Sequence, residues 1–191
     1  MKTESEKLNP QQSLDLITNM IKQAQGNISN NSKYFLLWGW CITLANFGMY
    51  SLMKFTTYPH PYVVWLITIP AWIITMIYGR KDGREAKVHT HLDSIMTWLW
   101  IGFGIAILPV IFFGNKINFQ INSIIILVSA LPTFVSGILL RFKPLLLGGI
   151  VFWVSGMLSF IADAPTQYLI GGTAMILGYL LPGYMLKNLK A

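Results

Sequence analysis

The sequence predicts an all-α polytopic membrane protein with six transmembrane helices, preceded by a short cytosolic amphipathic helix. Three observations predict it: the composition, six uncharged apolar runs, and the distribution of the cations. Of the 191 residues, 54% are hydrophobic and 11% are charged, and the mean hydropathy is +0.54. A chain of this composition lacks the polar residues that cover the surface of a water-soluble domain. The cations flank apolar runs and do not form one patch, so we expect no direct binding to nucleic acid.

Residues 1–33 form the predicted cytosolic N-terminal segment, with one amphipathic helix. Asn9 suits the N-cap position and Pro10 the first turn, and we expect the helix to end near Gly26. Six apolar side chains occupy one arc of this helix and make up a candidate partner-binding face: Leu14, Leu16, Ile17, Met20, Ile21 and Ala24. Such a face is buried against the membrane surface, the ends of the chain's own spans, or another protein. The opposite arc is nearly neutral, which weakens the membrane-surface alternative.

Six runs without Asp, Glu, Lys, Arg or His approach or reach the roughly 20 residues that a helix needs to cross a bilayer. They lie at 34–53, 62–79, 94–113, 121–140, 145–162 and 168–186, within a predicted transmembrane domain of residues 34–191. No soluble catalytic domain fits in the remaining residues. The loop at 141–144 is so short that the fourth and fifth spans must be antiparallel neighbours. Four prolines lie inside spans, where each removes a backbone hydrogen bond and predicts a kink: Pro70, Pro109, Pro132 and Pro182.

The cations predict the orientation of these spans. If the spans alternate in direction, twelve Lys and Arg residues fall on the side of both termini, and two, Lys54 and Lys116, fall on the other. Cations in short loops resist translocation, so both termini are predicted to be cytoplasmic. The cytosolic side includes a basic loop, for which we expect modest attraction to anionic lipid: Arg80, Lys81, Arg84 and Lys87.

One polar face is predicted inside the first span. Gly39, Thr43, Asn46 and Tyr50 share a narrow arc of the helix, and Asn46 falls near the middle of the membrane. A buried amide needs hydrogen-bond partners, so this face is expected to point into the bundle or into a wet cavity. Two interpretations follow: the face holds helices together, which we favour, or it lines a path for a small solute.

Stripes of small residues predict where the spans pack closely, because small side chains let two helix backbones approach. We favour packing within one bundle over a homo-oligomer interface, which stays an alternative. The stripes are Ser129, Thr133 and Gly137 in the fourth span, Gly171, Ala174 and Gly178 in the sixth, and Gly102 and Ala106 in the third.

The residues give no sign of catalysis, of a cofactor or of a metal. The chain has no glycine-rich phosphate loop before a helix and no recognisable nucleophile elbow. His89, His91 and Asp93 resemble a metal cluster, but the two histidines are two residues apart and do not share a helical face. No span carries Asp, Glu, Lys, Arg or His, which disfavours ion-coupled transport. We therefore expect a protein that is not an enzyme.

The amphipathic leader, the run "YFLLWGW" at 34–40 and the junction "IYGRKDGREAKV" at 77–88 together resemble a family of small, uncharacterised bacterial six-span inner-membrane proteins. The resemblance implies no activity, cofactor or catalytic residue. The sequence therefore suggests a non-enzymatic sensing or relay module that acts through a protein partner. The alternative is a small pore or facilitator for an uncharged or weakly charged solute, with the Asn46 face lining its path.

Overall fold

A computed structural model describes residues 10–85 and 91–188, with the backbone alone described at residues 10, 12–31 and 85. All regular structure in these residues is helical, which confirms the predicted all-α class. The α-helices are α1 (Pro10–Phe55), α2 (Thr68–Glu85), α3 (His91–Phe112), α4 (Ile121–Leu139), α5 (Lys143–Phe160), α6 (Ala164–Met175) and α7 (Leu181–Asn188). Three short helices join them: the 3-10 helices η1 (Pro61–Ile67) and η2 (Gly114–Ile117) and the π-helix η3 (Ile176–Leu180).

Six helical segments of the described chain are long and apolar enough to cross a membrane, as predicted. They are Ser32–Phe55, Pro61–Arg84, His91–Phe112, Ile121–Leu139, Lys143–Phe160 and Ala164–Asn188. Each overlaps one predicted span. The second segment joins η1 to α2 without a break, and the sixth joins α6, η3 and α7.

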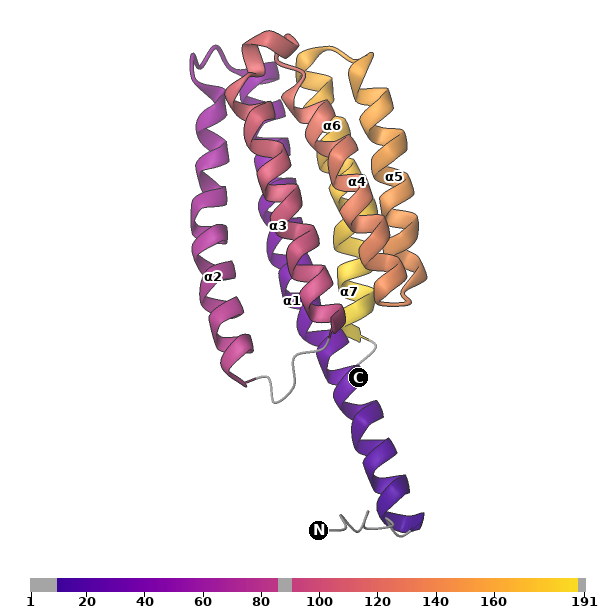
Figure 1. Cartoon of the computed structure of the whole chain (residues 1–191). Helices are drawn as coiled ribbons and strands as arrows, with labels where there is room; N and C mark the ends of the chain where they lie inside the picture. Colours follow the sequence, from indigo (N-terminus) through magenta and orange to yellow (C-terminus); the bar gives the residue numbers. More distant parts are fainter. Residues whose placement is uncertain (1–9, 86–90, 189–191) are drawn as a thin grey trace.

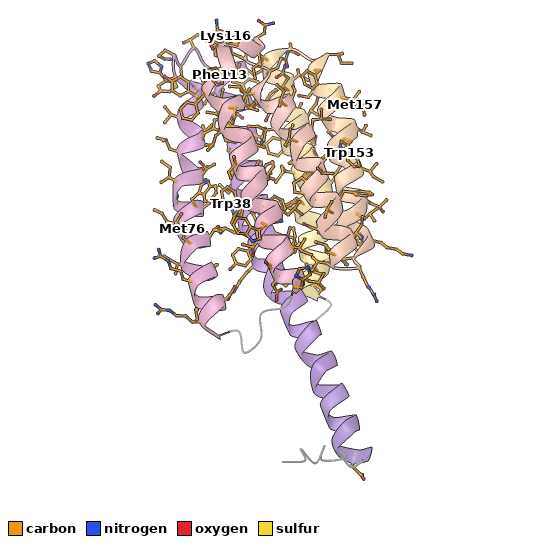
Figure 2. The ribbon with its side chains drawn as sticks, viewed as in Figure 1. Trp38, Met76, Phe113, Lys116, Trp153 and Met157 are labelled. Atoms are coloured by element: carbon orange, nitrogen blue, oxygen red, sulfur yellow. The ribbon has the colours of Figure 1, made fainter. Side chains whose placement is uncertain are left out.

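The helices run alternately up and down, so that successive connections lie at opposite ends of the bundle (Figure 1). The end of α2, the start of α3, the α4–α5 turn and the end of α7 lie at the end from which α1 projects. Phe113 and Lys116 lie at the opposite end (Figure 2). The helices therefore alternate in direction, as the cation count assumes. Which end of the bundle faces the cytoplasm stays a prediction.

The first helix differs from the prediction. α1 is one helix of 46 residues that passes Gly26 without interruption, so the predicted separate short helix is wrong. A single glycine costs about 1 kcal/mol relative to alanine but keeps its N–H, whereas the proline that would break the ladder does not occur again until Pro59. The predicted boundary between residues 33 and 34 falls inside α1, whose first part extends beyond the bundle (Figure 1). The side chains of the candidate partner-binding face lie outside the described part of the structure.

The helices are unequally buried. In an apolar stretch of 18 residues from each segment, 44% of the residues are buried in the α4 segment and 50% in the last segment, against 6% in the α2 segment and none in the α3 segment. α2 contacts chiefly α1 and η1, and α3 contacts chiefly α4. The apolar core therefore lies among α1, α4, α5, α6, η3 and α7, with α2 and α3 at the periphery. Its buried members are Phe35, Ile126, Ala130, Leu145, Phe152, Ala174, Tyr179 and Leu186.

α4 and α5 are antiparallel neighbours, as the short loop predicts. The turn between them uses the left-handed conformation of Arg141 (φ 51°), and the Phe142 N–H donates to the Gly137 carbonyl at 2.9 Å. This is a helix C-terminal cap in which the left-handed residue ends α4. The two backbones approach closely: a Cβ on Gly149 would lie 2.8 Å from the backbone nitrogen of Phe134. Small residues therefore set the separation of this pair.

Two of the four span prolines coincide with a change of helix type. Pro182 follows η3, and Pro70 follows the change from η1 to α2. Pro109 and Pro132 lie inside α3 and α4, which continue through them. At the η3 end, Pro182 lacks the N–H that would bond to the Gly178 carbonyl four residues earlier. That carbonyl lies against Gly148 of α5, so closely that a Cβ on Gly148 would collide with its oxygen.

Candidate functional site

The predicted polar face of α1 is turned into the bundle. Thr43 and Asn46 are 3% and 1% exposed. A Cβ on Gly39 would lie 2.7 Å from the Leu180 Cδ2 atom of η3. Tyr50 is half-buried, and its ring packs edge-on against Phe55 of the same helix at 6.0 Å between centroids. The structure therefore brings Gly39, Thr43 and Asn46 into the interior, and it places Tyr50 beside its own helix end.

Asn46 meets α4 and α6 at one point, Gly171. The Asn46 Nδ2 donates to the Ile42 carbonyl of its own helix at 2.9 Å, and its Oδ1 has no hydrogen-bond partner. A Cβ added to Gly171 would lie 2.5 Å from that Oδ1 and 2.9 Å from the Asn122 Nδ2 of α4. The Asn122 Nδ2 donates to the Gln167 carbonyl of α6 at 2.8 Å. Glycine at 171 is therefore what allows two amide side chains to meet over the α6 backbone.

Further polar residues join α4, α5 and α6 beside this point. The Gln167 Nε2 donates to the Gln120 Oε1 at 2.9 Å, and the Ser123 hydroxyl donates to the same oxygen at 3.1 Å. The Ser123 and Ser159 hydroxyls, both fully buried, are 2.8 Å apart. Sequence reasoning missed this set because its members lie near the ends of spans, where polar residues are expected to face water. An uncharged amide at the end of a span, repeated at 120, 122 and 167, was the available signal.

The chemistry of this polar interior is that of neutral amides and hydroxyls. The unpartnered Asn46 Oδ1 and Thr43 Oγ1 are buried acceptors, and a buried acceptor without a partner costs about 1–3 kcal/mol. At 1% exposure, the Asn46 side chain is enclosed by neighbouring helices. This geometry favours the interpretation in which the face holds helices together over the one in which it lines a path.

A second polar contact attaches α2 to α1 at the end from which α1 projects. The Lys33 Nζ lies 2.6 Å from one Asp82 oxygen, and the Tyr34 hydroxyl donates to the other at 2.7 Å. Further along the pair, the Trp38 Nε1 donates to the Thr75 hydroxyl at 3.0 Å, and Figure 2 shows Trp38 between the two helices. Because α2 buries little apolar surface, these polar contacts hold it against α1. The sequence analysis did not predict this contact, because Lys33 and Asp82 lie 49 positions apart.

Asp82→Asn should weaken the docking of α2 by about 1 kcal/mol, because it removes the charge that pairs with Lys33. The small size follows from partial exposure, 35% for the Lys33 side chain and 26% for that of Asp82. Amide hydrogen exchange of the purified protein measures it, as faster exchange confined to α2. Asp163→Asn removes an exposed carboxylate from the opposite end of the bundle and is the matched control. Equal exchange in the two variants would show that the ion pair does not hold α2.

The basic loop begins inside α2. Arg80, Lys81 and Arg84 occupy the last turns of this helix and are exposed, and Lys87 lies outside the described residues. His89 also lies outside them, so its relation to His91 and Asp93 stays a prediction. Within the described ranges, no three His, Cys, Asp or Glu side chains gather as a metal site would need.

The stripes of small residues pack inside the bundle in two of three cases. Thr133 and Gly137 of α4 are buried, as are all three members of the α6–η3 stripe. In α3, Gly102 and Ala106 are exposed, and a Cβ on Gly102 would meet nothing within 4 Å. Packing within one bundle is therefore confirmed for the fourth and sixth spans and is wrong for the third.

The fold and its interior define an all-helical protein with six helices that are long and apolar enough to span a membrane. Comparison with known protein families, with curated proteins and with solved structures found no match for this chain. The resemblance to small bacterial inner-membrane proteins stays a prediction.

Proposed function

We propose that this protein is a non-enzymatic, multi-pass module of the bacterial inner membrane that senses or relays through a protein partner bound to the first part of α1. The observation that carries the proposal is the continuity of α1 from Pro10 to Phe55. One helix joins the predicted partner-binding face to the packed interior of the bundle. We further propose that both termini are cytoplasmic.

Helix continuity supports a relay because a helix transmits displacement, whereas a flexible linker absorbs it. The part of α1 before Ser32 has 22 residues from Pro10 and measures about 30 Å along its axis. Inside the bundle, α1 is tightly packed against other helices: Gly39 lies against Leu180, and Asn46 lies over Gly171. A partner that tilts the projecting part therefore changes contacts inside the bundle.

The cations support the proposed orientation. The end of α2, the α4–α5 turn and the end of α7 lie at the end of the bundle from which α1 projects (Figure 1). Together with the adjoining part of α1, these segments carry most of the cations among the described residues: Lys33, Arg80, Lys81, Arg84, Arg141, Lys143 and Lys187. The opposite end carries Lys54 and Lys116. Positive charge concentrated at one end is typical of the cytoplasmic side of inner-membrane proteins. The pore alternative has less support, because the Asn46 face that would line the path is buried against α6.

The test compares cysteine reactivity along the projecting helix. In a Cys41→Ala background, single cysteines replace Ile17 or Ile21 on the candidate partner-binding face, or Asp15 or Asn19 on the opposite arc. Each variant reacts with a membrane-permeant maleimide in cells and, purified, in liposomes of the cells' own lipids. We expect the two apolar positions to react at least tenfold more slowly in cells than in liposomes, because the partner covers them in cells alone.

The opposite arc supplies the control, since cysteines at 15 and 19 should react equally in both settings. Protection of positions 17 and 21 in both settings would contradict the proposal, because lipid or the chain itself then covers the face. Full reactivity in both settings would also contradict it, because nothing then covers the face.

A further inference from the structure

The outer face of α2 carries aliphatic side chains that lead to two arginines. Ile73, Ile77, Arg80 and Arg84 follow one another at intervals of four, three and four residues, so they share one face of the helix. Ile73 and Ile77 are 55% and 58% exposed, and no other element among the described residues covers them. In a bilayer this stripe faces acyl chains, and the arginines lie where the helix leaves the hydrocarbon.

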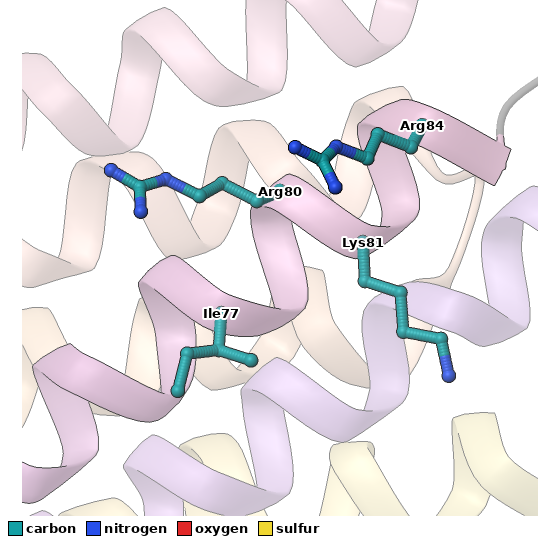
Figure 3. A pocket seen from close by; sticks show the side chains of 4 residues that line it. All are labelled: Ile77, Arg80, Lys81 and Arg84. Carbon is teal, nitrogen blue, oxygen red and sulfur yellow. The ribbon is translucent and has the colours of Figure 1, made fainter.

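The two guanidinium groups lie on the same side. Figure 3 shows Arg80 and Arg84 extending in one direction from α2, one turn apart, with Lys81 directed away from them. With Ile77 and Lys81 they line a shallow hollow on the surface of α2, open to its surroundings. Guanidinium groups form paired hydrogen bonds with phosphate oxygens, so a hollow with two of them suits a phosphate group better than a lone cation does.

The positive charge of this pair is not neutralised within the described structure. Neither guanidinium has an ion-pair partner there, and Asp82, the nearest acid whose side chain the structure describes, is held by Lys33 and Tyr34 toward α1. Two cations one helical turn apart repel each other, and a bound anion relieves that repulsion. This face of α2 therefore combines two positive charges, which attract an anionic headgroup, with an adjoining apolar stripe, which contacts an acyl chain.

We propose that Arg80 and Arg84 bind the phosphate of an anionic phospholipid whose acyl chain lies along Ile73 and Ile77. The occupant is a lipid and not a free phosphate, because the apolar stripe adjoins the arginines and only a lipid fills both. This proposal rests on the proposed location of the protein in a membrane, but it does not require the relay role. The lipid test can therefore fail while the proposed protein partner is confirmed, and the reverse.

The test measures lipid selectivity. The full chain is reconstituted in phosphatidylcholine vesicles, and electron spin resonance of spin-labelled phosphatidylglycerol and phosphatidylcholine gives their relative association. We expect the wild type to select phosphatidylglycerol, and each of Arg80→Gln and Arg84→Gln to lower that selectivity about fivefold at the site, the effect of one cation close to an anionic headgroup. The matched control is the double variant Arg141→Gln, Lys143→Gln, which removes two exposed cations from the same end of the bundle.

We expect the double variant Arg80→Gln, Arg84→Gln to lose this selectivity and the control double variant to keep it. Equal loss in the two double variants would overturn the proposal, because attraction is then a general property of the charged end. Unchanged selectivity in Arg80→Gln, Arg84→Gln would overturn it as well. Inorganic phosphate at the ionic strength of the assay should not displace the labelled lipid, and displacement would show an anion site without an acyl contribution. If the glutamine double variant does not fold, Arg80→Lys, Arg84→Lys keeps the charge: selectivity should fall because the forked bonds are lost, and undiminished selectivity counts against the site.

Discussion

Gly148→Ala should destabilise the bundle by about 3 kcal/mol, the largest effect that we expect from a single added methyl group in this chain. The new Cβ would collide with the carbonyl oxygen of Gly178, and a Cβ on Gly178 would in turn lie 2.9 Å from the Gly148 carbonyl. Both neighbours are backbone atoms of packed helices, so no flexible side chain can move aside. Reversible unfolding in mixed detergent micelles, followed by far-ultraviolet circular dichroism, gives the free energy of unfolding.

Gly102→Ala is the control for this prediction. Gly102 lies on the exposed face of α3 with nothing within 4 Å of the added atom, so the same change should leave stability unchanged or raise it slightly. A Gly148→Ala variant as stable as the Gly102→Ala variant would show that α5 and η3 separate without cost, which contradicts the close approach.

Gly171→Ala should cost about 2 kcal/mol, because its Cβ enters the space that the Asn46 and Asn122 side chains share. Asn46→Ala in the same chain should restore at least about 1 kcal/mol, since it removes the oxygen 2.5 Å from the new Cβ. The double-mutant cycle measures this coupling from four free energies of unfolding. If Asn46→Ala restores stability in the Gly171→Ala variant, Asn46 is in direct contact with α6 at Gly171.

Gly104→Ala supplies the reference cycle, since a Cβ there makes only an ordinary contact with Trp72 at 3.8 Å. The losses in the free energy of unfolding caused by Gly104→Ala and by Asn46→Ala should add in the double variant. If Gly171→Ala and Asn46→Ala also add, the two residues are not in contact, and the alternative in which the Asn46 face meets water regains support.

The six spans and their alternation were within reach of the sequence. A segment crosses a bilayer because of its own length and composition, which is a local property that can be read without knowing its neighbours. The antiparallel pairing of α4 with α5 followed in the same way, since a connection of a few residues leaves no other geometry. The prediction of a helix end at Gly26 failed for a related reason: glycine weakens a helix without interrupting its hydrogen bonds, and only proline at that place would have ended it.

The candidate site was predicted in part. Asn46 stood out because an amide in the middle of an apolar run needs partners. Its neighbours did not stand out: Gly171 has no polar atom in its side chain, and Asn122 lies at the start of a span, where polar residues are ordinary. The link between Lys33 and Asp82 was equally hidden, because it joins residues 49 positions apart.

By itself, then, the sequence determined how many times the chain can cross a membrane and which ends of the spans carry positive charge. The tertiary structure alone decided that Asn46 lies over Gly171, and that α2 stays at the periphery with Arg80 and Arg84 uncovered by the other described helices. The division has a physical cause. Crossing a bilayer depends on the free energy of transferring one segment, whereas a contact depends on the shapes of two surfaces that only folding brings together.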